Sequence, residues 1–124
     1  MQPKAPKLLE DVRDAAAFIL QVTASKSLED FESDRLLRQA VERNLEIIGE
    51  AVSRLTRVDP DVASRIGECR QIIAFRNILI HGYDIIDQAK VWQVITQDLP
   101  ELKNQVTELL QEYVAGEADG EEKK

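Results

Sequence analysis

The chain has 124 residues, of which 44% are hydrophobic and 31% charged, a balance typical of one globular domain with its own core. Its single cysteine excludes an internal disulfide, and no apolar run approaches the roughly 20 residues that span a bilayer. Residues 1–7 lack the apolar segment of a signal peptide. These features predict a cytoplasmic protein without a membrane segment.

The formal net charge of −7 is unevenly distributed along the chain. Residues 35–76 carry eight arginines, no lysine and six acids, whereas the segments on either side are acidic. The overall charge argues against non-specific binding of nucleic acid. The arginines of the middle segment either form ion pairs on solvated helix faces or recognise phosphate or carboxylate, which a guanidinium binds through two parallel hydrogen bonds.

Apolar residues recur at spacings of three and four over residues 8–24, which predicts a first helix. Ser27, followed by Asp30, then predicts the capped start of a short turn. A second and longer helix is predicted over residues 33–57. Gly49 lies in its middle, where glycine costs about 1 kcal/mol relative to alanine, and this indicates a close approach of another helix.

Asp59-Pro60 predicts a new helical turn, with aspartate as the N-cap and proline at the first helical position. A third long helix is predicted over residues 68–82 and a fourth over residues 87–113. Pro100 should kink or break the fourth helix, because proline removes a backbone donor and clashes with the preceding turn.

These elements predict an all-α protein, an antiparallel bundle of four to five helices. The helical domain is expected over residues 8–114. Residues 1–7 and the polar, acidic residues 115–124 are expected to be disordered.

Residues 68–83 have the sequence ECRQIIAFRNILIHGY, and their pattern differs from that of a helix that only packs against the core. On a helical wheel, four polar residues share one broad face, and the core-facing side consists of apolar residues. The polar residues are Arg76, Asn77, His81 and Tyr83, and the core-facing residues are Ile72, Phe75, Ile78 and Leu79. Ile73 and Ile80 fall between Arg76 and His81, so this face carries apolar as well as polar side chains. A helix of this kind is normally covered on both sides, and its simplest second cover is another copy of itself across a two-fold axis.

A two-fold axis at this helix has a chemical consequence. One histidine cannot serve as general acid and general base in the same step, but two copies would bring together two imidazoles and two guanidinium groups. Such a cleft has what metal-independent RNA cleavage needs, since histidine moves protons near neutral pH and arginine binds the scissile phosphate. The alternative interpretation is structural: His81 interacts with the helix dipole, and Arg76 forms an internal ion pair.

Residues 76–83 fit the pattern R-x4-H-x-Y, with a polar residue directly after the arginine. Upstream, residues 41–51 read VERNLEIIGEA, and downstream the chain contains Val91-Trp92 and Asp98-Leu99-Pro100. In this order, the segments resemble the HEPN superfamily and, within it, the HepT-like ribonuclease toxins. The resemblance extends over roughly residues 8–112.

The resemblance implies a helical bundle that dimerises through the motif helix, and a metal-independent endoribonuclease without a cofactor. RNA is implied as the substrate, with tRNA or mRNA as candidates. The family's catalytic arginine and histidine fall on Arg76 and His81, and its polar position on Asn77. Tyr83 matches a tyrosine that an MntA-type minimal nucleotidyltransferase antitoxin modifies with AMP, so the resemblance also implies a toxin–antitoxin module. Many relatives carry a Pro-Trp pair before the motif helix, where this chain reads Ile-Gly-Glu-Cys at residues 66–69.

Two other functions stay open at this point. The dimer cleft of a non-catalytic protein would bind nucleotide or RNA, and an interaction-only protein would be the regulatory subunit of a nucleotidyltransferase complex.

Glu46 and Glu50, four residues apart, are expected to pair with arginines rather than to bind a metal. Cys69 is expected to be a buried or half-buried small hydrophobic residue, although a reactive thiol at the start of a helix is the alternative.

Overall fold

The computed structural model describes residues 1–81 and 86–122, and the side chains as far as residue 116. In these ranges all regular structure is helical and no strand is present, which confirms the predicted all-α class. The helices are α1 (Ala5–Thr23), α2 (Leu28–Ser33), α3 (Arg35–Val58), α4 (Pro60–Ala63), α5 (Cys69–His81), α6 (Gln88–Gln93), the π-helical turn η2 (Val94–Asp98) and α7 (Leu99–Glu122).

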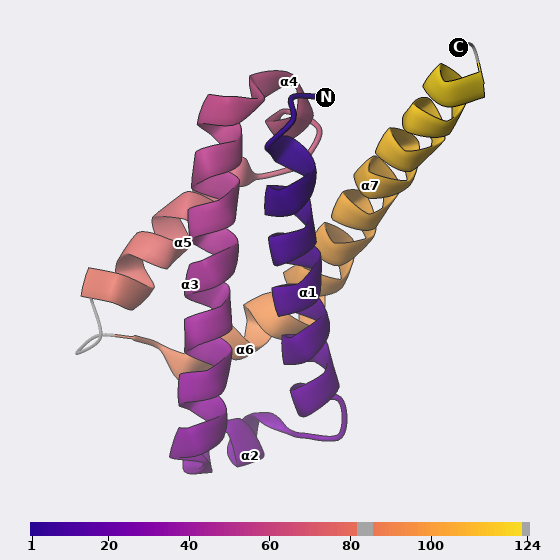
Figure 1. The fold of residues 1–124 in the computed structure, drawn as a ribbon. Helices are drawn as coiled ribbons and strands as arrows, with labels where there is room; N and C mark the ends of the chain where they lie inside the picture. Colours follow the sequence, from indigo (N-terminus) through magenta and orange to yellow (C-terminus); the bar gives the residue numbers. More distant parts are fainter. Residues whose placement is uncertain (82–85, 123–124) are drawn as a thin grey trace.

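Figure 1 shows α1 and α3 side by side and antiparallel, at the centre of a helical bundle. α1 also packs against α7, whereas α5 packs against α3 and projects away from the rest of the bundle. The predicted antiparallel bundle is therefore confirmed. None of the helices in the described ranges is both long and apolar enough to cross a membrane.

The core lies between α1, α3 and α7, whose buried residues recur at spacings of three and four. These residues are Leu9, Val12, Ala16 and Ile19 on α1; Val41, Leu45, Ile48, Val52 and Leu55 on α3; and Leu99, Leu102, Val106 and Leu109 on α7. Each fully buried aliphatic side chain contributes about 1.5–3 kcal/mol. At the end of the bundle, the ring of Phe31 on α2 lies 5.4 Å from that of Trp92 on α6, so the tryptophan packs against a core side chain.

The helix starts that the sequence predicted are present. At α2, the Ser27 hydroxyl accepts a hydrogen bond from the Asp30 amide, and the Asp30 carboxylate accepts one from the Ser27 amide. At α4, Asp59 is the N-cap, Pro60 is in the first turn, and the Asp59 carboxylate accepts a hydrogen bond from the Val62 amide. Local capping chemistry therefore fixes where these two elements begin.

The start of the chain differs from the predicted disorder over residues 1–7, because α1 begins at Ala5 with Pro6 in its first turn. The Gln2 amide donates a hydrogen bond of 2.8 Å to the carboxylate of Asp59, which is buried. The Ala5 side chain is fully buried. A tertiary partner 57 residues away in sequence orders this segment, and no local pattern in residues 1–7 reveals it.

Pro100 interrupts the last long helix, as predicted. The π-helical turn η2 separates α6 from α7, and Pro100 occupies the first turn of α7. A proline there would clash with the carbonyl four residues before it in a regular α-helix, and the wider π turn removes that contact.

Beyond residue 115, where disorder was expected, α7 stays helical to Glu122. Its alanine and glutamate residues are good helix formers, and extending an existing helix is much easier than starting one.

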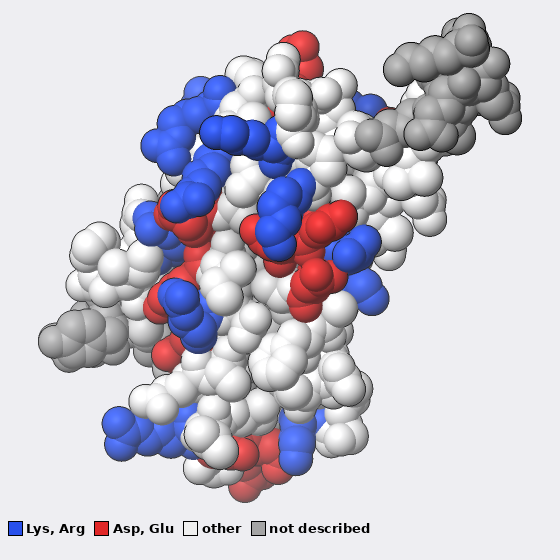
Figure 2. All heavy atoms as spheres, viewed as in Figure 1, with Lys and Arg blue, Asp and Glu red and all other residues white. Residues whose placement is uncertain are grey.

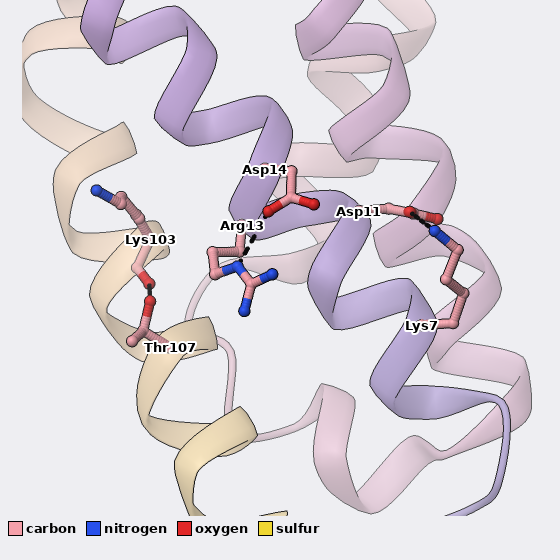
Figure 3. Close-up of polar contacts among 6 residues, drawn as sticks. All are labelled: Lys7, Asp11, Arg13, Asp14, Lys103 and Thr107. Carbon is pink, nitrogen blue, oxygen red and sulfur yellow. Dashed lines mark hydrogen bonds and ion pairs between the residues drawn. The ribbon is translucent and has the colours of Figure 1, made fainter.

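Many surface charges find partners within their own helix. On α1, Lys7 pairs with Asp11 at 2.9 Å and Arg13 with Asp14 at 3.0 Å (Figure 3). On α7, the hydroxyl of Thr107 donates to the backbone carbonyl of Lys103 at 2.7 Å (Figure 3). Exposed ion pairs of this kind contribute at most about 1 kcal/mol each, so these pairs need no functional explanation.

Candidate active site

Helix α5 carries the motif and is the least buried of the long helices. Only Leu79 of its 13 residues is buried. An exposed stripe runs along its outer face at spacings of three and four, and we call it the α5 stripe. Its members are Arg70, Ala74, Asn77, Ile78 and His81. The prediction that Ile78 faces the core was wrong, since its side chain is 50% exposed.

The inner face of α5 lies against α3, and Arg76 is on this side rather than on the α5 stripe. A Cβ atom added at Gly49 would lie 2.3 Å from the Cβ of Arg76 and 2.7 Å from its Cγ. Real side chains do not approach so closely, so the absence of a side chain at Gly49 is what admits the stem of Arg76. The close helix approach predicted from Gly49 is confirmed, and its partner is the motif arginine.

The guanidinium of Arg76 is held at two of its nitrogens. Its Nη2 lies 2.9 Å from Oε2 of Glu50, and its Nη1 donates to Oδ1 of Asn77 at 3.3 Å. Its Nε is buried and has no hydrogen-bond partner among the described residues. The side chain of Arg76 is 27% exposed, so this arrangement is accessible from solvent.

Glu50 is shared between two arginines. Its Oε1 accepts a hydrogen bond of 2.9 Å from Nε of Arg54, one turn further along α3. That hydrogen bond lowers the pKa of the Glu50 carboxyl, and the charge of Arg76 lowers it further, while burial opposes both. Nearby, Arg43 and Glu46 form a separate pair at 3.5 Å. The expectation that both glutamates pair with arginines is confirmed.

These charges line a groove of about 250 Å³ between α1, α3 and α5. Its lining residues are Leu8, Asp11, Arg43, Glu46, Ile47, Glu50, Ala51, Arg54, Arg76 and Ile80. Figure 2 shows acidic and basic side chains next to one another along α3 on this face. The groove is therefore polar but close to neutral, and Arg76 enters it already paired.

Three of the four predicted site residues lie in the described part of the chain, and they are divided between two surfaces of α5. Arg76 and Asn77 are in contact, and His81, at the end of α5, is exposed. Arg76 lines the groove, whereas His81 belongs to the α5 stripe together with Asn77. Tyr83 lies outside the described residues.

Sequence reasoning missed that the acid paired with the motif arginine is Glu50. The available signal was its position directly after Gly49, the glycine that already predicted a close helix contact. No group of three or more His, Cys, Asp or Glu side chains lies together as a metal site in the described part of the chain.

Cys69 begins α5, and its thiol is turned inward. Its Sγ donates to the backbone carbonyls of Ala63 at 3.1 Å and Ile66 at 3.3 Å. Burial raises the pKa of the Cys69 thiol. This finding supports the small, half-buried hydrophobic role and contradicts the reactive-thiol alternative.

On its other side, α5 is separated from the last helices by a mainly apolar cavity of about 370 Å³. Its lining includes Leu45 and Ile48 of α3, Ile72 and Phe75 of α5, and Leu102 of α7. The motif helix is therefore attached to the bundle chiefly through α3.

Comparison with known proteins shows which protein family the sequence matches. The family model described as "Ribonuclease HepT-like" matches residues 12–109. "Putative RNase TTE0752" of Caldanaerobacter subterraneus subsp. tengcongensis is 36% identical over 109 residues, which are 87% of this chain and 96% of the relative. "Probable ribonuclease HepT" of Thermococcus cleftensis is 33% identical over 105 residues, which are 82% of this chain and 91% of the relative. No solved structure matches the chain significantly.

Proposed function

Because the chain belongs to the ribonuclease HepT-like family, we propose that it is a metal-independent endoribonuclease whose active site forms between two copies of α5. The observation that carries the proposal is the α5 stripe, where Ala74 and Ile78 are exposed beside His81 on a helix with a single buried residue. Ile78 is a large aliphatic side chain, 50% exposed, that a second copy of the helix would cover. A two-fold axis along the stripe places both His81 side chains at one interface.

In the proposed reaction, the RNA 2′-hydroxyl attacks the adjacent phosphorus. One His81 removes the hydroxyl proton as the new O2′–P bond forms, and the other protonates the departing O5′ as the P–O5′ bond breaks. Arg76 faces α3, but its side chain is 27% exposed and contacts Asn77 of the stripe, and from there it would bind the non-bridging oxygens and offset the charge that develops on them. Asn77 accepts a hydrogen bond from Arg76 and contributes to the placement of the guanidinium.

The most direct test of this assignment is His81→Ala. The side chain is exposed in the single chain, so the variant should keep its fold, while cleavage of RNA should fall by about 100-fold or more because proton transfer is lost. The measurement is single-turnover cleavage of an RNA pool, alongside thermal unfolding and solution mass. Asn104→Ala, which alters an exposed polar residue on α7, is the matched control and should cleave normally. Equal cleavage by His81→Ala and the wild type would contradict the assignment.

We further propose that the chain is the toxin of a toxin–antitoxin module and that an MntA-type nucleotidyltransferase neutralises it by adding AMP to Tyr83. Tyr83 is two residues after His81, so an attached phosphate would add negative charge and bulk beside the motif and repel RNA. Co-expression with such a nucleotidyltransferase should add the mass of one or more AMP groups to the peptide containing Tyr83 and relieve growth arrest. An unmodified, non-toxic protein in both conditions would instead indicate a regulatory subunit.

A further inference from the structure

We propose that Glu50 is a positioning residue for Arg76, which it holds in the orientation that the scissile phosphate requires. The inference rests on the proposed function, because it concerns the arginine assigned to phosphate binding. It adds to that function a residue from another helix, outside the R-x4-H-x-Y segment. Its basis is the way in which α3 receives the Arg76 side chain.

The first step is the fit between Gly49 and Arg76. Because Gly49 has no side chain, the Cβ, Cγ and Cδ atoms of Arg76 can occupy the space beside it. A Cβ added at Gly49 would lie 2.3, 2.7 and 3.1 Å from these atoms. The stem of Arg76 therefore runs against the α3 backbone and cannot swing freely. This contact fixes where the guanidinium group is, but not how it is turned.

The second step is the rotation of the guanidinium group, which depends on the polar groups around it. Glu50 contacts Nη2 at 2.9 Å and Asn77 contacts Nη1 at 3.3 Å, while Nε has no partner among the described residues. The contact with Glu50 is an ion pair, and it is shorter than the neutral hydrogen bond to Asn77. Glu50 is therefore the dominant constraint on the orientation of Arg76.

The third step is that Glu50 is itself fixed. Arg54 donates to its other oxygen at 2.9 Å, so the carboxylate bridges two arginines. The remaining acids of the groove have other partners, since Glu46 pairs with Arg43 and Asp11 with Lys7. Glu50 is the acid that holds Arg76, and its charge has a cost: it partly neutralises the group that must attract the phosphate.

These opposing effects make a distinctive prediction for Glu50→Gln. The variant removes negative charge from the groove, so RNA should bind as well as before or better, and KM should not rise. It also releases the guanidinium, so kcat should fall about tenfold or more, because a small misplacement of a catalytic group is costly. Loss of charge alone would not lower kcat, and general destabilisation would lower the melting temperature.

The experiment compares Glu50→Gln with Glu46→Gln in the full-length protein. Glu46 lies one turn earlier on α3, lines the same groove and pairs with an arginine other than Arg76, which makes it a matched control. Cleavage is measured over a range of RNA concentrations to separate kcat from KM, and thermal unfolding verifies the fold. Glu50→Asp, which keeps the charge on a shorter side chain, should retain more activity than Glu50→Gln.

A second readout does not depend on cleavage. NMR of arginine side chains should show restricted rotation of the Arg76 guanidinium in the wild type and in Glu46→Gln, and faster rotation in Glu50→Gln. Faster rotation with a lowered kcat supports the proposal. Restricted rotation in Glu50→Gln overturns it, as does an equal loss of kcat in Glu46→Gln. A wild-type protein that cleaves no RNA would defeat the proposed function, while the NMR comparison would still decide whether Glu50 holds Arg76.

Discussion

At the scale of single residues, the complementarity of Gly49 and Arg76 is the feature on which the site depends. The sequence alone indicated that another helix comes close at Gly49, because a glycine in a helix interior is costly without such a reason. It did not indicate which residue fills the space, since that depends on the rotation of α5 about its axis. The same rotation places Ile78 outside and Arg76 inside, where the helical wheel had put them the other way round.

Gly49→Ala tests this fit. The added methyl would overlap Cβ of Arg76, an atom close to the backbone that cannot move away cheaply, so we expect a loss of about 1–3 kcal/mol in the free energy of unfolding. Displacement of the guanidinium should also reduce RNA cleavage. Gly116→Ala is the control, because an added Cβ there meets nothing within 4 Å and the change should be neutral or slightly stabilising. Urea unfolding measures both variants, and equal stabilities would show that the helices are not in close contact at Gly49.

Cys69 gives a second prediction at this scale. Burial raises its pKa, so at pH 8 a smaller fraction should be thiolate than in a free cysteine. Alkylation by iodoacetamide should therefore be slower in the folded protein than in urea, and its rate should continue to rise above the usual thiol pKa. Rapid alkylation of the folded protein at neutral pH would mean that the thiol is activated instead of shielded.

At the scale of helices, the starts of α2 and α4 and the interruption at Pro100 followed from local chemistry, because caps and proline act within one turn. The start of α1 did not, since its ordering partner is Asp59, far along the chain. The helical end of α7 was not predicted for a different reason. The polar composition of these residues favours exposure to solvent, but it does not prevent an existing helix from continuing.

Asp59→Asn tests the junction between α1 and α4. The hydrogen bond from the Gln2 amide and that from the Val62 amide lower the pKa of Asp59, while burial opposes them. A carboxyl whose pKa is lower in the folded than in the unfolded state stabilises the fold above its unfolded pKa, and this stabilisation disappears as the pH falls through the folded value. We expect the variant to lose about 1 kcal/mol at pH 7 and the difference from the wild type to shrink below about pH 4. Urea unfolding at pH 7 and pH 3 measures both, and a difference that does not change with pH would contradict the assigned hydrogen bonds.

At the scale of the whole molecule, the main observation is how incompletely α5 is covered. It packs on α3 and projects away from the rest of the bundle (Figure 1). It also borders a cavity on the side of α7, and the side chains of the α5 stripe are exposed. The sequence predicted that this helix needs a second partner, because apolar residues lie on nearly all of its sides. A second copy would cover Ala74 and Ile78 and bring the two His81 side chains towards each other.

The central claim is that RNA is cleaved at a two-fold contact along the α5 stripe, and Ile78→Glu tests it most directly. Because Ile78 is 50% exposed, the variant should keep its fold, but buried like charges should prevent association. Leu36→Glu is the control, since Leu36 is 79% exposed and lies on α3, outside the stripe.

The measurement is solution mass together with RNA cleavage on the same samples. If RNA is cleaved at this contact, the wild type and Leu36→Glu are dimers that cleave RNA, and Ile78→Glu is a folded monomer that does not. A wild-type protein that cleaves RNA as a monomer, or a monomeric Ile78→Glu that cleaves at the wild-type rate, would contradict it.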